Sequence, residues 1–404
     1  MSNTLLTSSV IMKESLRILK NELTFTRGVN REYDEKFGVT GAKVGATINA
    51  RKPPRYVGRL GQALQVEAST ETYVPITLDT QFGVDISFSS ADLTLSIDEF
   101  ADRFLKPAMA TVANKVDYDG LQLFRDVNNF AGTAGVLNGG SVTSAQVQQT
   151  ILAARRKMTE NGVPYSPRNI TVDPNSSANI VSGLTNLFNP SGTISKIFNN
   201  GALGDGVLGF NFAEDANVAS FTPQAAGSLT AISAVPASGA TTLAVTTTAG
   251  TVPRGTVFTV AGVFAINPQS RQSTNSLMQF VVTADTVVTT SGTLPIYPAY
   301  IPSGQFATCI GTPGSTAAIV LLSGAVAAGP YAQNLAYHKD AFTLASADLL
   351  LPGGVDMAER DNFDGISMRM VRQYDINSDL FPVRFDVLYG WKTIYPELAV
   401  RITG

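Results

Sequence analysis

Cysteine, histidine and tryptophan are nearly absent from this sequence, each occurring once in 404 residues. The single cysteine, Cys309, excludes an internal disulfide and a cysteine-clustered metal site, and it fits folding in a reducing compartment. Because zinc sites take most of their ligands from cysteine and histidine, we expect no metal and no cofactor. Any catalytic triad or Cys–His pair would depend on His338, for which a structural or surface role is favoured.

Charged residues are also scarce, at 15% of the chain, where about 25% is usual. Two explanations stay open: much of the surface is covered by other protein, or the chain is rich in strands and Thr/Ser-rich turns. The net charge is −3 and no arginine-rich tail is present. Proteins that bind nucleic acid by neutralising phosphates carry such basic arms.

Long apolar runs are missing as well, because no window reaches the roughly 20 apolar residues of a membrane helix. Charges at Lys13, Glu14, Arg17 and Lys20 interrupt the apolar pattern of the first 23 residues. We therefore expect neither a membrane span nor a secretory signal. That same pattern predicts a helix, with Ser8 or Ser9 as its cap and an apolar face: Met12, Leu16, Leu19 and Leu23.

A basic, extended segment follows the first helix. The paired prolines Pro53 and Pro54 remove amide donors and force extended backbone, so residues 45–82 predict a long hairpin that leaves the body of the protein. The candidate contact residues there are Arg51, Lys52, Arg55 and Arg59. They could touch nucleic acid or be solvated; we prefer contact with an acidic protein surface.

The strongest local signal is the capping box formed by Ser96 and Glu99. The apolar residues that follow the capping box recur at helical spacing and predict a helix over 96–127. They include Phe104, Ala108, Val112 and Val116. A second helix is predicted at 144–161, a strand at 169–172 and a further helix at about 175–188, and 186–218 is predicted as loop.

The composition then changes abruptly. Between residues 219 and 334 the only charged side chains are Arg254, Arg271 and Asp285, and short alternating runs recur between turn signals. This pattern predicts an inserted all-β domain, barrel-like or a sandwich. Two long strands, around 366–371 and 383–391, follow it.

Three other patterns with possible chemistry are weak. Asp117, Asp119 and Asp126 resemble a calcium loop, but Lys115 stands where the first carboxylate should be. The glycine-rich 201–206 lacks the strand and helix of a phosphate cradle. Nothing singles out a pair of carboxylates for glycoside cleavage. We predict no catalytic residue and no enzyme.

The order of these elements, together with four stretches, resembles the major capsid proteins of tailed bacteriophages, which have the Hong Kong ninety-seven fold. The four stretches are 255–268, 334–340, 384–391 and 396–399. The similarity spans nearly the whole chain and is greatest to the coat proteins of short-tailed Salmonella phages, which carry an inserted β-barrel. It implies an α+β fold with N-arm, extended loop, peripheral domain with its spine helix, axial domain and inserted domain.

Carried onto this chain, the resemblance implies six segments. They are an N-arm (1–44), an extended loop (45–82), a peripheral domain (83–164) with spine helix 96–127, the first part of the axial domain (165–218), the inserted β domain (219–334), and the completion of the axial and peripheral domains (335–404).

The resemblance also implies partners. Copies of the chain would form hexamers and pentamers of an icosahedral shell in the virion, assembled in the bacterial cytoplasm with a scaffolding protein and a portal protein. A decoration or cement protein is a further candidate. The shell would enclose double-stranded DNA without sequence-specific binding and without a membrane.

One departure concerns the inserted domain. Relatives carry a charged loop that bridges neighbouring capsomers, whereas residues 228–250 contain no charge here. The bridge is then absent or apolar. Other interpretations are a tail-fibre or adhesin protein, which usually shows repeats, a phage depolymerase, and a non-viral compartment shell of the same fold.

Overall fold

The computed structural model describes residues 8–33, 47–52, 56, 58, 61–62, 64, 66, 72–89, 104–137, 142–184, 204, 206–222, 229–247, 250–322 and 330–403. The chain divides into two compact units. The first unit comprises Met1–Lys52, Tyr73–Gly120 and Phe342–Ile394, and the second comprises Pro53–Thr72, Leu121–Ala341 and Tyr395–Gly404.

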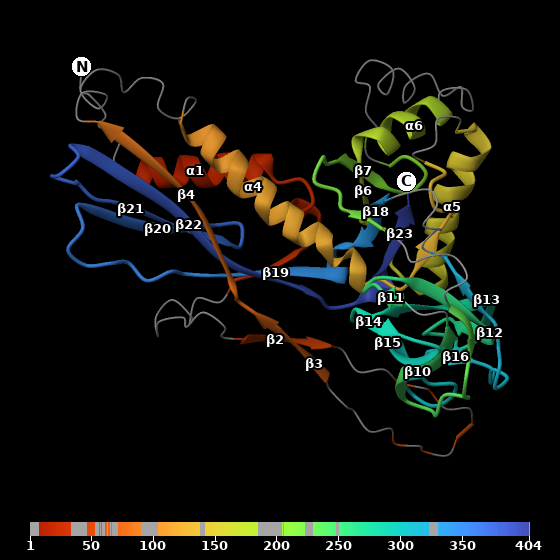
Figure 1. Cartoon of the computed structure of the whole chain (residues 1–404). Coiled ribbons are helices and arrows are strands. Elements are labelled where there is room, and N and C mark those ends of the chain that lie inside the picture. Colours follow the sequence, from red (N-terminus) through yellow and green to blue (C-terminus); the bar gives the residue numbers. More distant parts are fainter. Residues whose placement is uncertain are drawn as a thin grey trace. The chain divides into compact units, whose positions relative to one another are not determined.

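The first unit is built on a six-stranded sheet with the order β1-β19-β22-β21-β20, in which β4 also pairs with β22. Figure 1 shows the helices α1 and α4 lying along this sheet. The elements of the unit are α1 (Ser8–Glu22), η1 (Thr26–Gly28), β1 (Asn30–Tyr33), β2 (Thr47–Lys52), β3 (Thr72–Thr77), β4 (Thr80–Ser89), α4 (Lys106–Leu121), β19 (Phe342–Ala347), β20 (Met357–Phe363), β21 (Ile366–Arg372) and β22 (Leu380–Thr393).

One apolar core joins the two helices to the sheet. The predicted face of the first helix is buried in it, and so are Ala108, Val112 and Val116 of α4. The strands present Met368, Met370, Val383, Phe385, Val387 and Tyr389 to the same core. These are alternate positions of β21 and β22, and the strands predicted around 366–371 and 383–391 are confirmed.

The predicted spine helix differs from the structure at two points. Its α-helical part ends at Leu121, and the chain continues to Asp126 as the tighter 3₁₀ turn η3 (Gln122–Asp126), a common form at helix ends. Phe104, expected on the apolar face, is 38% exposed. The predicted capping box, Ser96 to Glu99, lies outside the described residues.

The second unit contains another six-stranded sheet, ordered β5-β23-β18-β6-β7, with β8 paired to β18. Its elements besides the all-β part are η3, β5 (Phe130–Ala131), α5 (Ser144–Glu160), β6 (Arg168–Val172), α6 (Pro174–Leu184), β7 (Asn211–Glu214), β8 (Ser220–Phe221), β18 (Tyr331–His338), η5 (Lys339–Ala341), η6 (Pro396–Leu398) and β23 (Ala399–Thr403).

Helix α5 confirms the prediction for 144–161 to within one residue. Its capping box is made by Thr143 and Gln146. The prediction of loop throughout 186–218 was wrong at β7, which pairs in parallel with β6. The register places Phe212 beside Ile170, and burial of both residues stabilises a strand that a Gly- and Asn-rich composition obscured.

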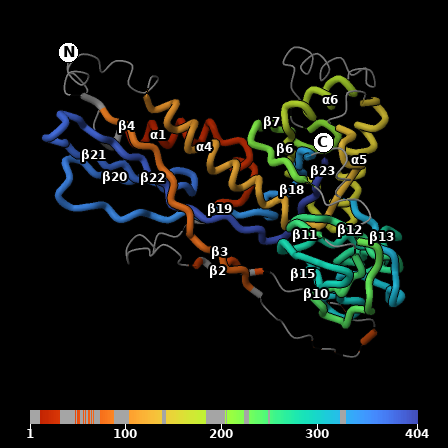
Figure 2. Tube along the Cα trace, in the orientation of Figure 1, coloured from red at the N-terminus to blue at the C-terminus, as the bar shows by residue number. Residues whose placement is uncertain are grey.

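The remaining strands of the second unit form an all-β part, called here the β-module. They are β9 (Leu229–Ile232), β10 (Ala240–Thr247), β11 (Gly250–Val252), β12 (Val257–Ile266), β13 (Ser273–Val282), β14 (Thr286–Val288), β15 (Ser291–Tyr300), β16 (Cys309–Ile310) and β17 (Ile319–Leu321). The seven-stranded sheet runs β16-β12-β13-β15-β10-β9, with β17 paired to β12, and it has a core of its own. In Figure 2 these strands gather into one bundle.

The first and last residues of the predicted segment 219–334 belong to the six-stranded sheet of the second unit, through β8 and β18. Tyr331 and Ala332 of β18 pair with β8, and further along β18 pairs with β6 and β23. The strands of the β-module itself therefore run from Leu229 to Leu321.

Candidate assembly surfaces

The predicted extended hairpin begins and ends in a two-stranded pairing of β2 with β3. Arg51 and Lys52 are the last two residues of β2, and Lys52 is half-buried. Arg55 and Arg59 lie outside the described residues, so the role of these four residues stays a prediction. The described positions farther along the hairpin carry exposed apolar side chains: Tyr56 is 58%, Leu64 81% and Val66 83% exposed.

The backbone of this hairpin contacts the β-module of the same chain through Arg271. The guanidinium donates to the carbonyl oxygens of Gly304 at 2.6 Å, Gln305 at 3.0 Å and Tyr56 at 3.4 Å. Arg271 is thus a cation held by backbone carbonyls. Sequence reasoning missed this contact because Tyr56 and Arg271 are 215 positions apart.

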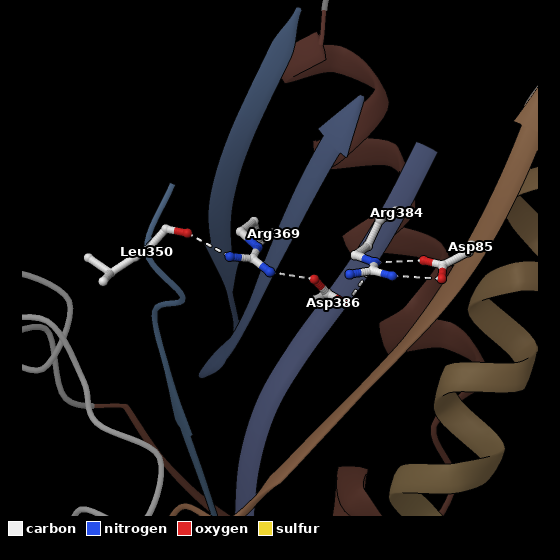
Figure 3. A network of polar contacts seen from close by, with 5 residues as sticks. All are labelled: Asp85, Leu350, Arg369, Arg384 and Asp386. Atoms are coloured by element: carbon white, nitrogen blue, oxygen red, sulfur yellow. Dashed lines mark hydrogen bonds and ion pairs between the residues drawn. The ribbon is translucent and has the colours of Figure 1, made fainter. Parts of the chain in front are cut away.

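The face of the first sheet that is opposite to the helices carries a row of alternating charges (Figure 3). Arg384 of β22 donates from Nε and Nη2 to the two carboxylate oxygens of Asp85 on β4, at 2.8 and 2.9 Å. Arg369 of β21 donates to Asp386 of β22 at 2.6 Å and to the carbonyl of Leu350 at 2.6 Å.

The strand register produces this row. Arg384 lies opposite Asp85, and Arg369 lies opposite Asp386, so each ion pair is a cross-strand pair. The hydrogen bond from Arg384 lowers the pKa of Asp85. The Asp85–Arg384 pair is exposed whereas Asp386 is buried. Backbone pairing with β22 holds β4, the strand that follows the hairpin, in the sheet, and the Asp85–Arg384 pair adds one side-chain contact between the two strands.

The sole histidine is buried at the end of β18. His338 is 4% exposed, and its Nδ1 accepts a hydrogen bond from the Asp340 amide at 3.4 Å. Burial lowers the pKa of His338. Its ring hydrogen-bonds to the Asp340 amide, and the charges of Asp340, Lys339 and Arg168 also act on it, which favours a structural role for the ring.

The three aspartates of the weak calcium pattern are occupied by other contacts. Asp117 is 2% exposed and accepts hydrogen bonds from the amides of Thr24 at 2.7 Å and Thr26 at 2.9 Å. Asp119 pairs with Lys115 at 2.6 Å, and Asp126 pairs with Arg254 at 2.6 Å. No cluster of three potential metal ligands occurs within the described ranges.

A fully buried cation, Arg401 of β23, was missed from the sequence. Its Nε and Nη2 donate to Oε1 of Gln333 at 3.0 and 2.7 Å, and its Nη1 donates to the carbonyl of Gly255. The guanidinium also lies 5.1 Å from the ring centre of Phe124. Burial lowers its pKa to about 9. The sequence feature that could have indicated it is a single arginine in an apolar strand, between the buried residues Val400 and Ile402.

For the part of the chain that the structure describes, no helix is long and apolar enough to span a membrane.

Comparisons with known proteins place the chain in a family. The family model described as "P22 coat protein - gene protein 5" matches residues 65–404. A search of curated proteins finds no match.

Several solved structures are similar. A chain of Mycobacterium phage Che8 shares 13% identity and a TM-score of 0.45, over 94% of this chain and 90% of that chain. The mature capsid of bacteriophage PhiM1 shares 14% identity and a TM-score of 0.44, over 94% of this chain and 86% of that chain. The CUS-3 coat protein I-domain shares 22% identity at a TM-score of 0.20, over 25% of this chain and 99% of that chain.

The predicted α+β capsid fold is confirmed, since helices and sheets share each unit and the family model runs over most of the sequence. The chain belongs to the P22 coat protein family.

Proposed function

We infer that this chain is the major capsid protein of a bacteriophage, and that many copies of it form the phage shell. The observation that carries this conclusion is the match of the coat protein family over residues 65–404, which includes both units. The fold itself does not dictate a function, so the family match carries the conclusion and the assembly behaviour of the protein tests it.

In finer detail, we propose hexamers and pentamers in an icosahedral shell around double-stranded DNA. The net charge of −3 gives the chain no means of condensing DNA by itself. A portal protein that admits DNA and a scaffolding protein that guides assembly in the bacterial cytoplasm fit this charge. The β-module corresponds to the inserted domain of the short-tailed Salmonella phage relatives in this proposal, and a cement protein remains a candidate partner.

The extended hairpin is the proposed clamp between subunits, with Arg51, Lys52, Arg55 and Arg59 as its contact residues. Exposed Leu64 and Val66 support this role. A hairpin of two paired strands has no core of its own, and apolar side chains in solvent gain about 25 cal/mol per Å² when another surface covers them.

Electron microscopy of the purified, overexpressed protein tests the proposed function. Shells, tubes or capsomers are expected. A compact trimer would instead support a tail fibre or adhesin. A shell that forms around protein cargo and never takes up DNA during infection would support a non-viral compartment.

A further inference from the structure

A groove in the second unit lies between helix α5 and the outer face of the β-module sheet. Its volume is about 410 Å³, within the usual range of binding pockets. One wall is formed by Ala153, Arg156 and Lys157 of α5. The opposite side is formed by strands β12, β13 and β17, and Phe130 lies against it as well. None of these residues has a role in the functions described above.

The floor of the groove is mostly apolar and continues into an open strip. Leu277 and Val320 line the groove, and Val320 is 55% exposed. Leu277 lies opposite Phe264, which lies opposite Ile310 on the next strand. Directly opposite residues project from the same face of a sheet. The row is therefore continuous, and Phe264 and Ile310 are 38% and 43% exposed.

Lys157 is the unusual member of the wall. The residue is only 7% exposed, yet no described group lies within hydrogen-bonding distance of its Nζ. Glu160, one turn along the helix, pairs with Arg156 at 3.3 Å. Burial lowers the pKa of Lys157. Most of the side chain is buried, which disfavours the charged form although the Glu160 carboxylate favours it. The groove that Lys157 lines is the space from which a further acceptor can approach.

We propose that this groove is an interface between copies of the chain, in which a neighbouring copy places a carboxylate against Lys157 and apolar side chains along the floor. The inference rests on the proposed function, since a shell surrounds each subunit with further copies. Acidic residues are plentiful on such a neighbour, with 32 Asp and Glu against 29 Lys and Arg. A nucleic acid fits less well, because its phosphates would lie against Leu277 and Val320.

Amine acylation read by peptide mass spectrometry provides the first test. Unassembled subunits and assembled shells of the same protein are treated with an N-hydroxysuccinimide ester, and Lys13, exposed on α1, serves as the reference for reagent activity. Lys157 should be acylated in the subunit and protected about tenfold or more in the shell, as expected if one contact closes the groove. Equal modification in both states, or protection in both, overturns the proposal.

A substitution separates an interface role from a structural one. Lys157→Met keeps the length of the side chain and removes the charge from a residue that is mostly buried. The melting temperature of the subunit should stay the same or rise, while the concentration of subunit needed for shell formation rises about tenfold. Arg155→Met, at an exposed position of the same helix that does not line the groove, is the matched control and should change assembly less.

Loss of subunit stability together with unchanged assembly would assign Lys157 to the fold alone and overturn the interface. The experiments distinguish failure of the groove interface from failure of the proposed capsid function. If the wild-type protein forms normal shells in which Lys157 is still acylated, the capsid function is supported and the groove interface is rejected. If the wild type forms no shell, both fall.

Discussion

Two charged side chains, Asp117 and Arg401, are buried and form hydrogen bonds with neutral groups. Asp117 accepts amide hydrogens of residues 24–26, and Arg401 donates to Gln333 and to the carbonyl of Gly255. Each therefore holds segments that are distant in the sequence. Removing either side chain would leave its buried polar partners without a hydrogen bond. The resulting loss of stability exceeds the net contribution of the hydrogen bonds themselves.

Asp117→Ala should lower the free energy of unfolding of the first unit by about 3 kcal/mol, because hydrogen bonds to a charged acceptor are worth roughly 1.5–3 kcal/mol. Urea unfolding followed by Trp391 fluorescence measures this, since Trp391 packs in the same unit. Asp85→Ala is the control, and its exposed ion pair is worth about 0–1 kcal/mol. Equal effects of the two substitutions would contradict the assigned role of Asp117.

His338 gives the second unit a pH dependence of known sign. Burial holds its folded pKa below the ordinary value. The neutral ring therefore contributes stability above about pH 6.5, and this contribution is lost as the pH falls through the folded pKa.

The wild type should lose more thermal stability between pH 7 and pH 5 than His338→Gln, which keeps an acceptor but cannot titrate. Because His338 is the only histidine, the difference between the two melting curves isolates its contribution. Parallel curves would show that the ring is protonated equally in the folded and unfolded states.

At the scale of elements, the periodic apolar patterns predicted those helices and strands whose formation depends on local sequence. Helices α1 and α5 and strands β21 and β22 follow their apolar spacing. The capping box of α5 was readable in Thr143 and Gln146 but was overlooked. Strand β7 was not readable, because its stability comes from pairing with β6 more than 40 residues earlier. Local composition contains no information about such a partner.

The candidate site was harder to predict than the fold. The sequence singled out the basic residues of the hairpin by charge alone, and two of those four, Arg51 and Lys52, fall in described backbone. The charge row on the first sheet and the groove beside Lys157 depend on register and on packing between distant segments. Neither arises from a motif, so no spacing rule could have located them.

The β-module should fold when expressed alone as residues 229–322. Its core comprises Leu229, Val245, Phe258 and other buried residues that all come from within these limits. The NMR spectrum of the isolated segment should show dispersed amide signals. Outside the full chain, Val257 and Val281 lose the contact with Phe130, so a lowered melting temperature is expected as well. A disordered spectrum would mean that the β-module needs the six-stranded sheet of the second unit in order to fold.

At the scale of the whole molecule, the proposed assembly accounts for both the low content of charge and the exposed apolar residues of the hairpin. A monomer keeps such surfaces in water, whereas a subunit of a shell covers them with other copies. The proposed clamp contact is heterologous, one surface against a different one, and this geometry builds rings and closed lattices. Weak contacts become sufficient because every subunit repeats them.

Charge reversal in the hairpin tests this explanation. Arg55→Glu with Arg59→Glu should leave the subunit folded, because a hairpin without a core contributes little to the stability of its own chain. Shells should fail to form or should dissociate in moderate salt, since exposed ion pairs contribute about 0–1 kcal/mol each and are screened. Circular dichroism with a melting curve checks the fold, and sedimentation at several salt concentrations checks assembly. Lys13→Glu, at an exposed position of α1 outside the hairpin, is the matched control for added negative charge. Shells of the double variant as stable as those of the wild type would remove the hairpin from the inter-subunit contacts.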